Sequence, residues 1–211
     1  KIAFQSDRFG SSDLFLMDAK GGKPQRLTVH SAADRITDIT ADGSVLFNTR
    51  RMYAQVEREQ EIHQVSIAGG TPTRYMDALG FDATLSPDGS KVAFVRGTCR
   101  IEREAYRGPA NRDLWIYDLN ADTYTALTTF EGNEFSPDWV DDNQLIFISP
   151  KSGKYNLHSI TLDGTEVQIT NESAFGINAF SLSSSAQTII YQSGDKITKL
   201  NLSDNTTNDL N

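Results

Sequence analysis

One sequence unit recurs five times along this chain, and this repeat constrains the fold more than any other feature. Each copy begins with a short β-run that carries a Phe or Tyr, and the aromatic positions are Phe4, Phe47, Phe94, Phe147 and Tyr191. They are 43, 47, 53 and 44 residues apart. A period of about 45 residues is typical of an array of equal structural units. The whole chain is therefore expected to be one repetitive domain.

Further features recur in each copy: a second β-run, a third run closing in Leu-Thr or a variant, and a turn signal before the aromatic run. Examples are Asp13–Asp18 and Asp113–Asp118 for the second run, Leu27-Thr28, Leu127-Thr128 and Ile169-Thr170 for the closing pair, and 41–44, 86–89, 141–143 and 183–185 for the turns. The hydrophobic alternation has a period of two, and no segment sustains a period of 3.6. Four short antiparallel strands per unit predict an all-β fold, a β-propeller of four-stranded blades.

The units run approximately over 1–28, 29–76, 77–128, 129–170 and 171–211. The first unit begins at its second strand, so about five blades are expected, the first of them incomplete. An open propeller edge exposes unpaired backbone groups. We therefore expect a closed ring whose remaining sequence lies beyond the two ends of this chain.

Composition limits the classes of partner. The chain has 20 Lys and Arg against 28 Asp and Glu, a net charge of −8. Nucleic acid and anionic membrane surfaces both require clustered positive charge, so neither is an expected partner. No apolar run approaches 18 residues, which argues against membrane insertion. The single cysteine, Cys99, excludes an internal disulfide.

The most distinctive segment is the enlarged connection in the third unit, where Tyr106-Arg107-Gly108 leads to the run Leu114-Trp115-Ile116. It resembles the N-terminal six-bladed propeller of tricorn-type proteases. The Ser-Asp-Arg, Gly-Gly-x-Pro-x-Arg-Leu-Thr and Ser-Pro-Asp-Gly elements also resemble the propeller repeats of the TolB family. The tricorn resemblance covers the whole chain and implies that Lys1 falls in the second blade and Asn211 at the end of the sixth. It also implies a second propeller, a PDZ domain and a serine-peptidase core elsewhere in the parent polypeptide.

No residue pattern indicates catalysis, a metal or a cofactor within this chain. There is no Gly-x-Ser-x-Gly nucleophile elbow. The histidines His30, His63 and His158 are far apart in sequence, and the last two occupy equivalent strand positions, which indicates a structural role. The acidic turns lack the alternating spacing of a calcium loop. Any peptidase activity is therefore expected to belong to another part of the parent protein.

Arg35 is the candidate substrate-binding residue. In the tricorn family, a paired arginine after the second blade is thought to receive the C-terminal carboxylate of a peptide, and Arg35 matches the second arginine of that pair. Asp34 stands in place of the first, and its carboxylate would neutralise Arg35 and repel an anionic peptide end, so a local Asp34–Arg35 surface pair is the favoured interpretation. Arg50-Arg51 is a true arginine pair, but it lies past the aromatic strand and does not match the motif.

The insertion 96–112 is the second candidate contact region, because long loops on a rigid scaffold often carry contacts. Tyr106, Arg107 and Arg112 are its candidate contact residues. Docking against a neighbouring blade or another domain of the same polypeptide is the favoured interpretation, and direct contact with substrate is the alternative.

These observations predict a non-catalytic propeller of a tricorn-like serine peptidase that gates or docks peptide substrates and products. Expected partners are peptide or protein segments and other domains of the same polypeptide, and the full-length form could be a homo-oligomer. The alternatives are a TolB-like protein-binding propeller of the periplasm and an access-gating propeller of another hydrolase. A periplasmic location is expected, with the cytoplasm as the alternative.

Overall fold

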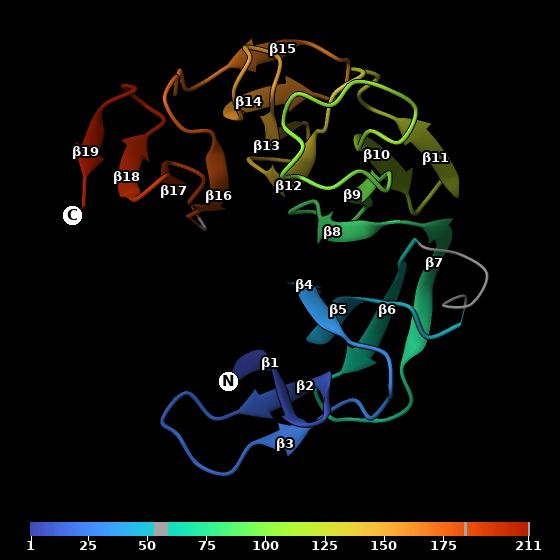
Figure 1. The fold of residues 1–211 in the computed structure, drawn as a ribbon. Coiled ribbons are helices and arrows are strands. Elements are labelled where there is room, and N and C mark those ends of the chain that lie inside the picture. The colour runs from blue at the N-terminus through green and yellow to red at the C-terminus, as the bar shows by residue number, and fades with distance from the viewer. Residues whose placement is uncertain (53–58, 184, 211) are drawn as a thin grey trace. The chain divides into compact units, whose positions relative to one another are not determined.

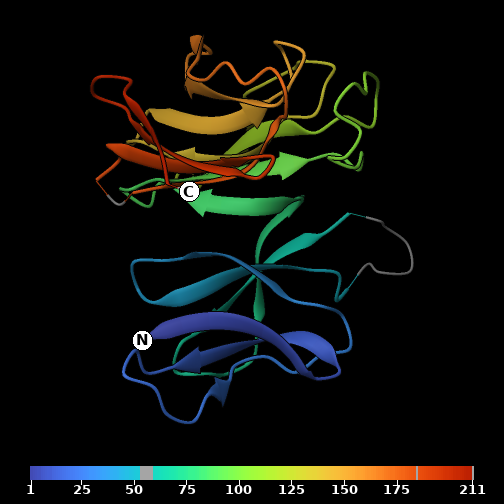
Figure 2. The same cartoon turned by 60° about the vertical axis from the view of Figure 1, so that its left-hand side comes forward.

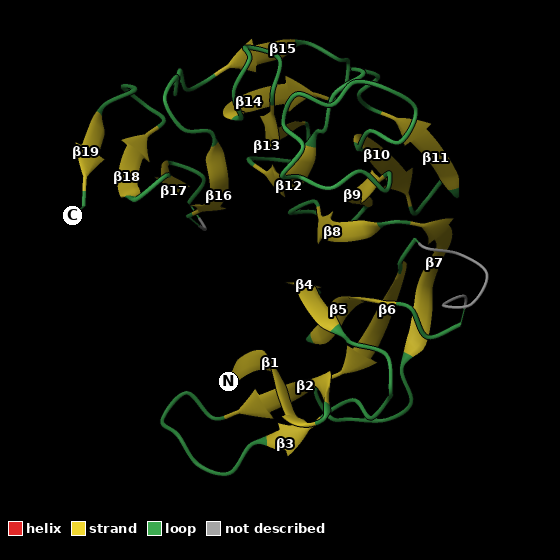
Figure 3. Ribbon diagram, viewed as in Figure 1, coloured by secondary structure: helices red, strands yellow, loops and turns green. Residues whose placement is uncertain are grey.

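The computed structural model describes residues 1–52, 59–183 and 185–210, and within these ranges every regular element is a β-strand (Figure 3). The strands are β1 (Ile2–Phe9), β2 (Ser11–Met17), β3 (Gln25–Arg26), β4 (Arg35–Ile39), β5 (Ser44–Thr49), β6 (Glu61–Ser66), β7 (Thr73–Leu79), β8 (Phe81–Leu85), β9 (Lys91–Arg96), β10 (Asp113–Asp118), β11 (Thr123–Ala126), β12 (Phe135–Trp139), β13 (Gln144–Ser149), β14 (Asn156–Thr161), β15 (Glu166–Gln168), β16 (Ile177–Leu182), β17 (Thr188–Ser193), β18 (Lys196–Asn201) and β19 (Thr207–Asp209).

The strands pair with their sequence neighbours to form antiparallel sheets (Figure 1). The first sheet contains β1, β2 and β3, which lie side by side in Figures 1 and 2, and each of the following sheets contains four strands in sequence order. The predicted all-β fold of antiparallel blades is therefore confirmed. The chain divides into two compact units, Lys1–Leu85 and Ser86–Asn211. No helix of the described residues is long and apolar enough to cross a bilayer.

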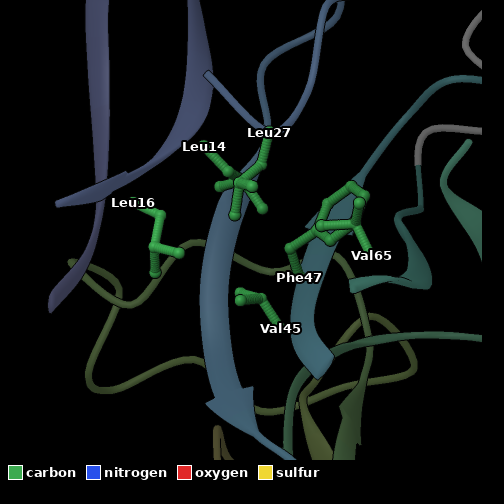
Figure 4. Close-up of a cluster of buried hydrophobic side chains, with 6 residues drawn as sticks. All are labelled: Leu14, Leu16, Leu27, Val45, Phe47 and Val65. Atoms are coloured by element: carbon green, nitrogen blue, oxygen red, sulfur yellow. The ribbon is translucent and has the colours of Figure 1, made fainter. Parts of the chain in front are cut away.

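The repeated aromatic residue occupies the middle of the second strand of each four-stranded sheet, on β5, β9, β13 and β17. Phe47, Phe94 and Phe147 are fully buried, and Tyr191 is 4% exposed. In the first compact unit, Phe47 packs with apolar side chains from its own strand β5, from β2 and β6, and from the segment after β3 (Figure 4). The members of this cluster are Leu14, Leu16, Leu27, Val45, Phe47 and Val65. The repeated aromatic residue is therefore a core position of each four-stranded blade, whereas Phe4 in the first sheet is half-buried.

The structure explains why each third run ends in Leu-Thr or a close variant. The Thr28 hydroxyl accepts a hydrogen bond from the backbone N–H of Leu14 at 2.9 Å. The same bond recurs from Leu114 to Thr128 at 3.0 Å, and from Leu157 to Thr170 at 2.9 Å. These bonds are buried, where an unpaired backbone N–H would be costly. In each of these sheets, this threonine follows the outermost strand and its hydrogen bond ties that strand to the neighbouring one.

The predicted turns 41–44 and 86–89 connect β4 to β5 and β8 to β9. In the second turn, the Asp88 carboxylate accepts hydrogen bonds from the Ser86 hydroxyl at 2.6 Å and from the Ser90 backbone N–H at 2.8 Å. These bonds favour the charged form and lower the pKa of Asp88 to about 2. The predicted turn 183–185 contains Ser184, which lies outside the described residues, as does Asn211 at the end of the last predicted unit.

Candidate functional site

The ends of β4 and β5 bring three arginines and one aspartate together in the first compact unit. Successive side chains of a strand point to opposite faces of the sheet. Arg35 pairs in register with Asn48, so Arg50 lies diagonally across from Arg35 on the same face. Such diagonal neighbours are roughly 7–8 Å apart, within reach of long side chains. By the same alternation, Asp34 and Arg51 belong to the opposite face.

On that opposite face, Asp34 and Arg51 form a two-bond ion pair. The Arg51 Nε donates to Asp34 Oδ1 at 3.1 Å, and Arg51 Nη2 donates to Asp34 Oδ2. The Asp34 side chain is fully buried, and the Arg51 guanidinium also lies 5.3 Å from the centre of the Phe47 ring. The expected Asp34–Arg35 surface pair is therefore wrong, because two adjacent residues at the start of a strand cannot face the same side.

On their own face of the sheet, Arg35 and Arg50 are exposed and line one hollow of about 490 Å³ with Ala32, Ala33 and Gln60. Within the part of the chain that the structure describes, neither arginine forms a salt bridge. A guanidinium presents several N–H donors in a planar fork that matches the two oxygens of a carboxylate. Two such forks in one hollow can hold an anionic group through charge-assisted hydrogen bonds.

The internal repeat shows that these arginines depart from the pattern of the other blades. On β12 and β13, the pair Phe135 and Ile148 corresponds to Arg35 and Asn48, and Phe135 is buried. The residue that follows β13, in the place of Arg50, is Pro150. The corresponding residues at β16 and β17 are Ala179 and Gly194. Packing of the repeat therefore does not call for arginine at either position.

Sequence reasoning identified Arg35 but set Arg50 aside, because the pair Arg50-Arg51 lies past the aromatic strand and does not match the family motif. The signal that could have found Arg50 is the hairpin itself. The turn 41–44 sets which residues of β4 and β5 lie opposite each other, and counting outward from it places Arg50 near Arg35.

The insertion 96–112, whose first residue still belongs to β9, packs on the sheet of β12–β15 within the second compact unit. The Glu104 carboxylate accepts a hydrogen bond from the Tyr155 backbone N–H and pairs with the Lys154 ammonium group at 3.1 Å. The Tyr155 hydroxyl donates to the Ile101 carbonyl at 2.8 Å. This docking of the insertion is made by Glu104 and Tyr155, which were not among the predicted contact residues.

Of the three predicted contact residues, Arg107 also reaches that sheet. Its guanidinium lies 4.9 Å from the centre of the Phe130 ring and donates to the Pro150 carbonyl at 3.4 Å. Tyr106 and Arg112 make contacts inside the insertion: the Tyr106 hydroxyl accepts from the Ala110 N–H at 3.2 Å, and Arg112 Nε donates to the Cys99 carbonyl at 2.7 Å.

Two acidic residues near the base of the insertion have raised pKa values. Burial raises the pKa of Asp113 to about 6, and the nearby Glu134 carboxylate contributes to the rise. Burial also raises the pKa of Glu134, whose carboxylate accepts from the Ser149 hydroxyl at 2.9 Å and pairs with the Lys151 ammonium at 3.2 Å. The negative charge of Asp113 is therefore unfavourable in the folded protein.

Asp113→Asn is expected to make the protein more stable than the wild type at pH 7.5 and to give no advantage at pH 4. The ordinary pKa of this carboxyl is 3.8, and in the folded state it is about 6. Between these values the native state binds more protons than the unfolded chain, so stability falls as the pH rises through this window. Denaturant titrations at the two pH values measure the difference, and a less stable variant at pH 7.5 would contradict the expectation. Asp88→Asn, with its lowered pKa, is a control expected to act in the opposite direction.

The two repeated histidines lie in equivalent surroundings. His63 faces Phe47 and His158 faces Phe147 across their strand pairs, with ring centroids 5.8 Å apart in both cases. A glutamate oxygen lies 2.9 Å from His63 Nε2 and another lies 2.8 Å from His158 Nδ1. Burial lowers the pKa of His63. Among the described residues, no group of three or more His, Cys, Asp or Glu side chains could hold a metal ion.

Comparison with known proteins places the chain in a family. The model of the family described as the tricorn protease N-terminal beta propeller domain matches residues 1–206. The chain belongs to this tricorn propeller family. The β-propeller predicted from the repeat is thereby confirmed. The crystal structure of the tricorn protease agrees, with a TM-score of 0.83 and 17% identity over 99% of this chain and 21% of that one.

Other relatives of this tricorn-family propeller share shorter or more distant similarity. TolB from Acinetobacter baumannii superposes with a TM-score of 0.77 and 15% identity, over 99% of this chain and 51% of that one. An uncharacterized protein of Agrobacterium fabrum is 26% identical over 54% of this chain, and an uncharacterized peptidase of Bacillus subtilis is 25% identical over 46%. These alignments span only 36% and 14% of the two curated relatives.

Proposed function

We propose that this chain is a non-catalytic propeller of a tricorn-type serine peptidase, where it docks peptide substrates or products by their C-terminal carboxylate. The observation that carries this proposal is the exposed hollow lined by Arg35 and Arg50. The chain has a net charge of −8, so two neighbouring arginines without a described acidic partner form a local attraction for an anion on an otherwise acidic protein. Other domains of the parent polypeptide would supply the peptidase chemistry.

Arg35→Gln and Arg50→Gln are each expected to weaken the binding of a short peptide with a free C-terminal carboxylate by about ten-fold. A hydrogen bond to a charged group contributes about 1.5–3 kcal/mol, and exposure to solvent places this site at the lower end. The measurement is the fluorescence anisotropy of a labelled pentapeptide at low salt. The same peptide with a C-terminal amide should bind weakly to the wild type and be insensitive to both changes.

Arg100→Gln is the matched control, because Arg100 is exposed and its removal changes the net charge by the same amount in the other compact unit. If Arg100→Gln weakens binding as much as Arg35→Gln, the attraction is general and the proposed site is wrong. Equal affinity for the carboxylate and amide peptides would also contradict it.

The similarity to TolB supports a second candidate, a propeller that binds an extended segment of a partner protein. Binding in that case would not depend on a free carboxylate, so the amide peptide would bind as well as the acid. The reading frame that contains this chain separates the two candidates further. A PDZ domain and a serine-peptidase core in that frame are expected for a tricorn-type parent, and a TolB-like parent would have neither.

A further inference from the structure

The buried Asp34–Arg51 pair lies directly behind the two exposed arginines of the hollow. Asp34 immediately precedes Arg35, and Arg51 immediately follows Arg50. The pair joins the start of β4 to the chain just past the end of β5 through two hydrogen bonds. The Asp34 side chain is fully buried and the Arg51 side chain is 11% exposed, so both lie where their geometry is fixed by packing.

At both ends of this link, a backbone N–H group also donates a hydrogen bond. The Asp34 N–H donates to the Ser12 carbonyl at 2.8 Å, and the N–H of Met52 donates to Glu61 Oε1 at 3.1 Å. The Glu61 side chain is itself buried at the start of β6. The chain is therefore anchored by hydrogen bonds next to both exposed arginines.

We infer that Asp34 and Arg51 are positioning residues that hold Arg35 and Arg50 in place to bind one carboxylate. This inference rests on the carboxylate site proposed above. A binding side chain is most effective when neighbouring contacts already fix it. A mobile guanidinium loses conformational freedom when it binds, and this loss weakens its affinity for the ligand. Asp34 also neutralises Arg51, so that two of the three arginines are left to bind the ligand.

A competing interpretation predicts the opposite change in peptide affinity when the charge of Asp34 is removed. If Asp34 acted on the site mainly through its negative charge, it would repel an anionic peptide end. Removing the charge would then tighten binding. If Asp34 acts by positioning, removing its charge weakens the link to Arg51 and loosens the binding arginines.

The second unit contains a matched pair that controls for stability. Glu134 and Lys151 occupy the positions of Asp34 and Arg51 relative to β12 and β13, and their charged groups are 3.2 Å apart. The Glu134 N–H donates at 2.8 Å to the carbonyl of Arg112, as the Asp34 N–H does to the carbonyl of Ser12. The neighbours of this pair are Phe135 and Pro150, which offer no positive charge to a ligand.

The test measures the ratio of affinities for the acid and amide forms of the labelled pentapeptide in Asp34→Asn, Arg51→Lys and Glu134→Gln. Asp34→Asn keeps the volume of the side chain, and Arg51→Lys keeps the charge but loses the planar guanidinium that makes two hydrogen bonds to Asp34. Both are expected to lower affinity for the acid peptide by about three- to ten-fold, the size of a moderate coupling between neighbours. The amide peptide should be unaffected, and Glu134→Gln should leave the ratio unchanged even if its melting temperature falls.

Each result has a distinct meaning. Tighter binding of the acid peptide to Asp34→Asn would overturn the positioning role in favour of the charge interpretation. Unchanged binding in both Asp34→Asn and Arg51→Lys would also overturn it, while an effect of Arg35→Gln in the same assay would leave the carboxylate site standing. If neither these variants nor Arg35→Gln and Arg50→Gln alter binding, the proposed function itself fails. Should Asp34→Asn not fold, Arg51→Lys alone decides the question.

Discussion

Phe147→Ala is expected to lower the free energy of unfolding by about 3–5 kcal/mol, because a buried phenylalanine leaves both a transfer cost and a cavity when truncated. Phe147 is fully buried on β13, and its ring lies 5.8 Å from that of His158 on β14. Denaturant titration at 25 °C, followed by tryptophan fluorescence, gives the value. Phe147→Leu should cost less, because it keeps most of the apolar volume.

Val167→Ala on β15 of the same sheet is the control, since Val167 is 60% exposed and its truncation should change stability by less than about 0.5 kcal/mol. Similar losses in Phe147→Ala and Val167→Ala would show that the repeated aromatic position is not the core of its blade.

Gly97→Ala is expected to cost about 3 kcal/mol or more, or to prevent folding of the second unit. Gly97 has a φ of +128°, outside the region that a side chain tolerates, and an added Cβ would lie 2.0 Å from the backbone oxygen of Asn111. That oxygen belongs to the returning end of the insertion, so the two ends would have to separate. Backbone strain of about 1–3 kcal/mol then adds to the steric clash. Thermal unfolding monitored by circular dichroism measures the loss.

Gly89→Ala separates backbone strain from the clash. Gly89 has a φ of +71°, and no atom lies within 4 Å of a Cβ added there. Only the cost of a left-handed conformation remains, about 1–2 kcal/mol. If Gly97→Ala and Gly89→Ala are equally destabilising, the close approach at Gly97 does not hold the insertion in place.

Much of the fold could be predicted because it depends on local patterns that recur. The alternation of apolar residues specifies strands, the turn residues specify which strands are neighbours, and the fivefold repetition specifies the blades. Phe94 and Phe147 stand out in the sequence by their period, and both are fully buried. The Leu-Thr ending was visible as a motif, but its reason, a hydrogen bond from Leu114 to Thr128, required the structure.

The candidate site was only half predictable. Arg35 followed from the resemblance to tricorn-type propellers, whereas Arg50 was set aside because the pair Arg50-Arg51 lies past the aromatic strand and does not match the motif. The partner of Asp34 was also assigned wrongly, to Arg35 in place of Arg51. The order of residues in the sequence does not directly show which positions lie opposite each other across a hairpin.

The sequence by itself determined that this protein is a repeated antiparallel β-structure, because alternation and turn chemistry act over a few residues. Only the tertiary structure decided which arginine is neutralised and which two remain exposed. The physical reason is the pleat combined with register: a strand sends neighbours to opposite faces, and its pairing brings residues from a distant part of the chain to the same face.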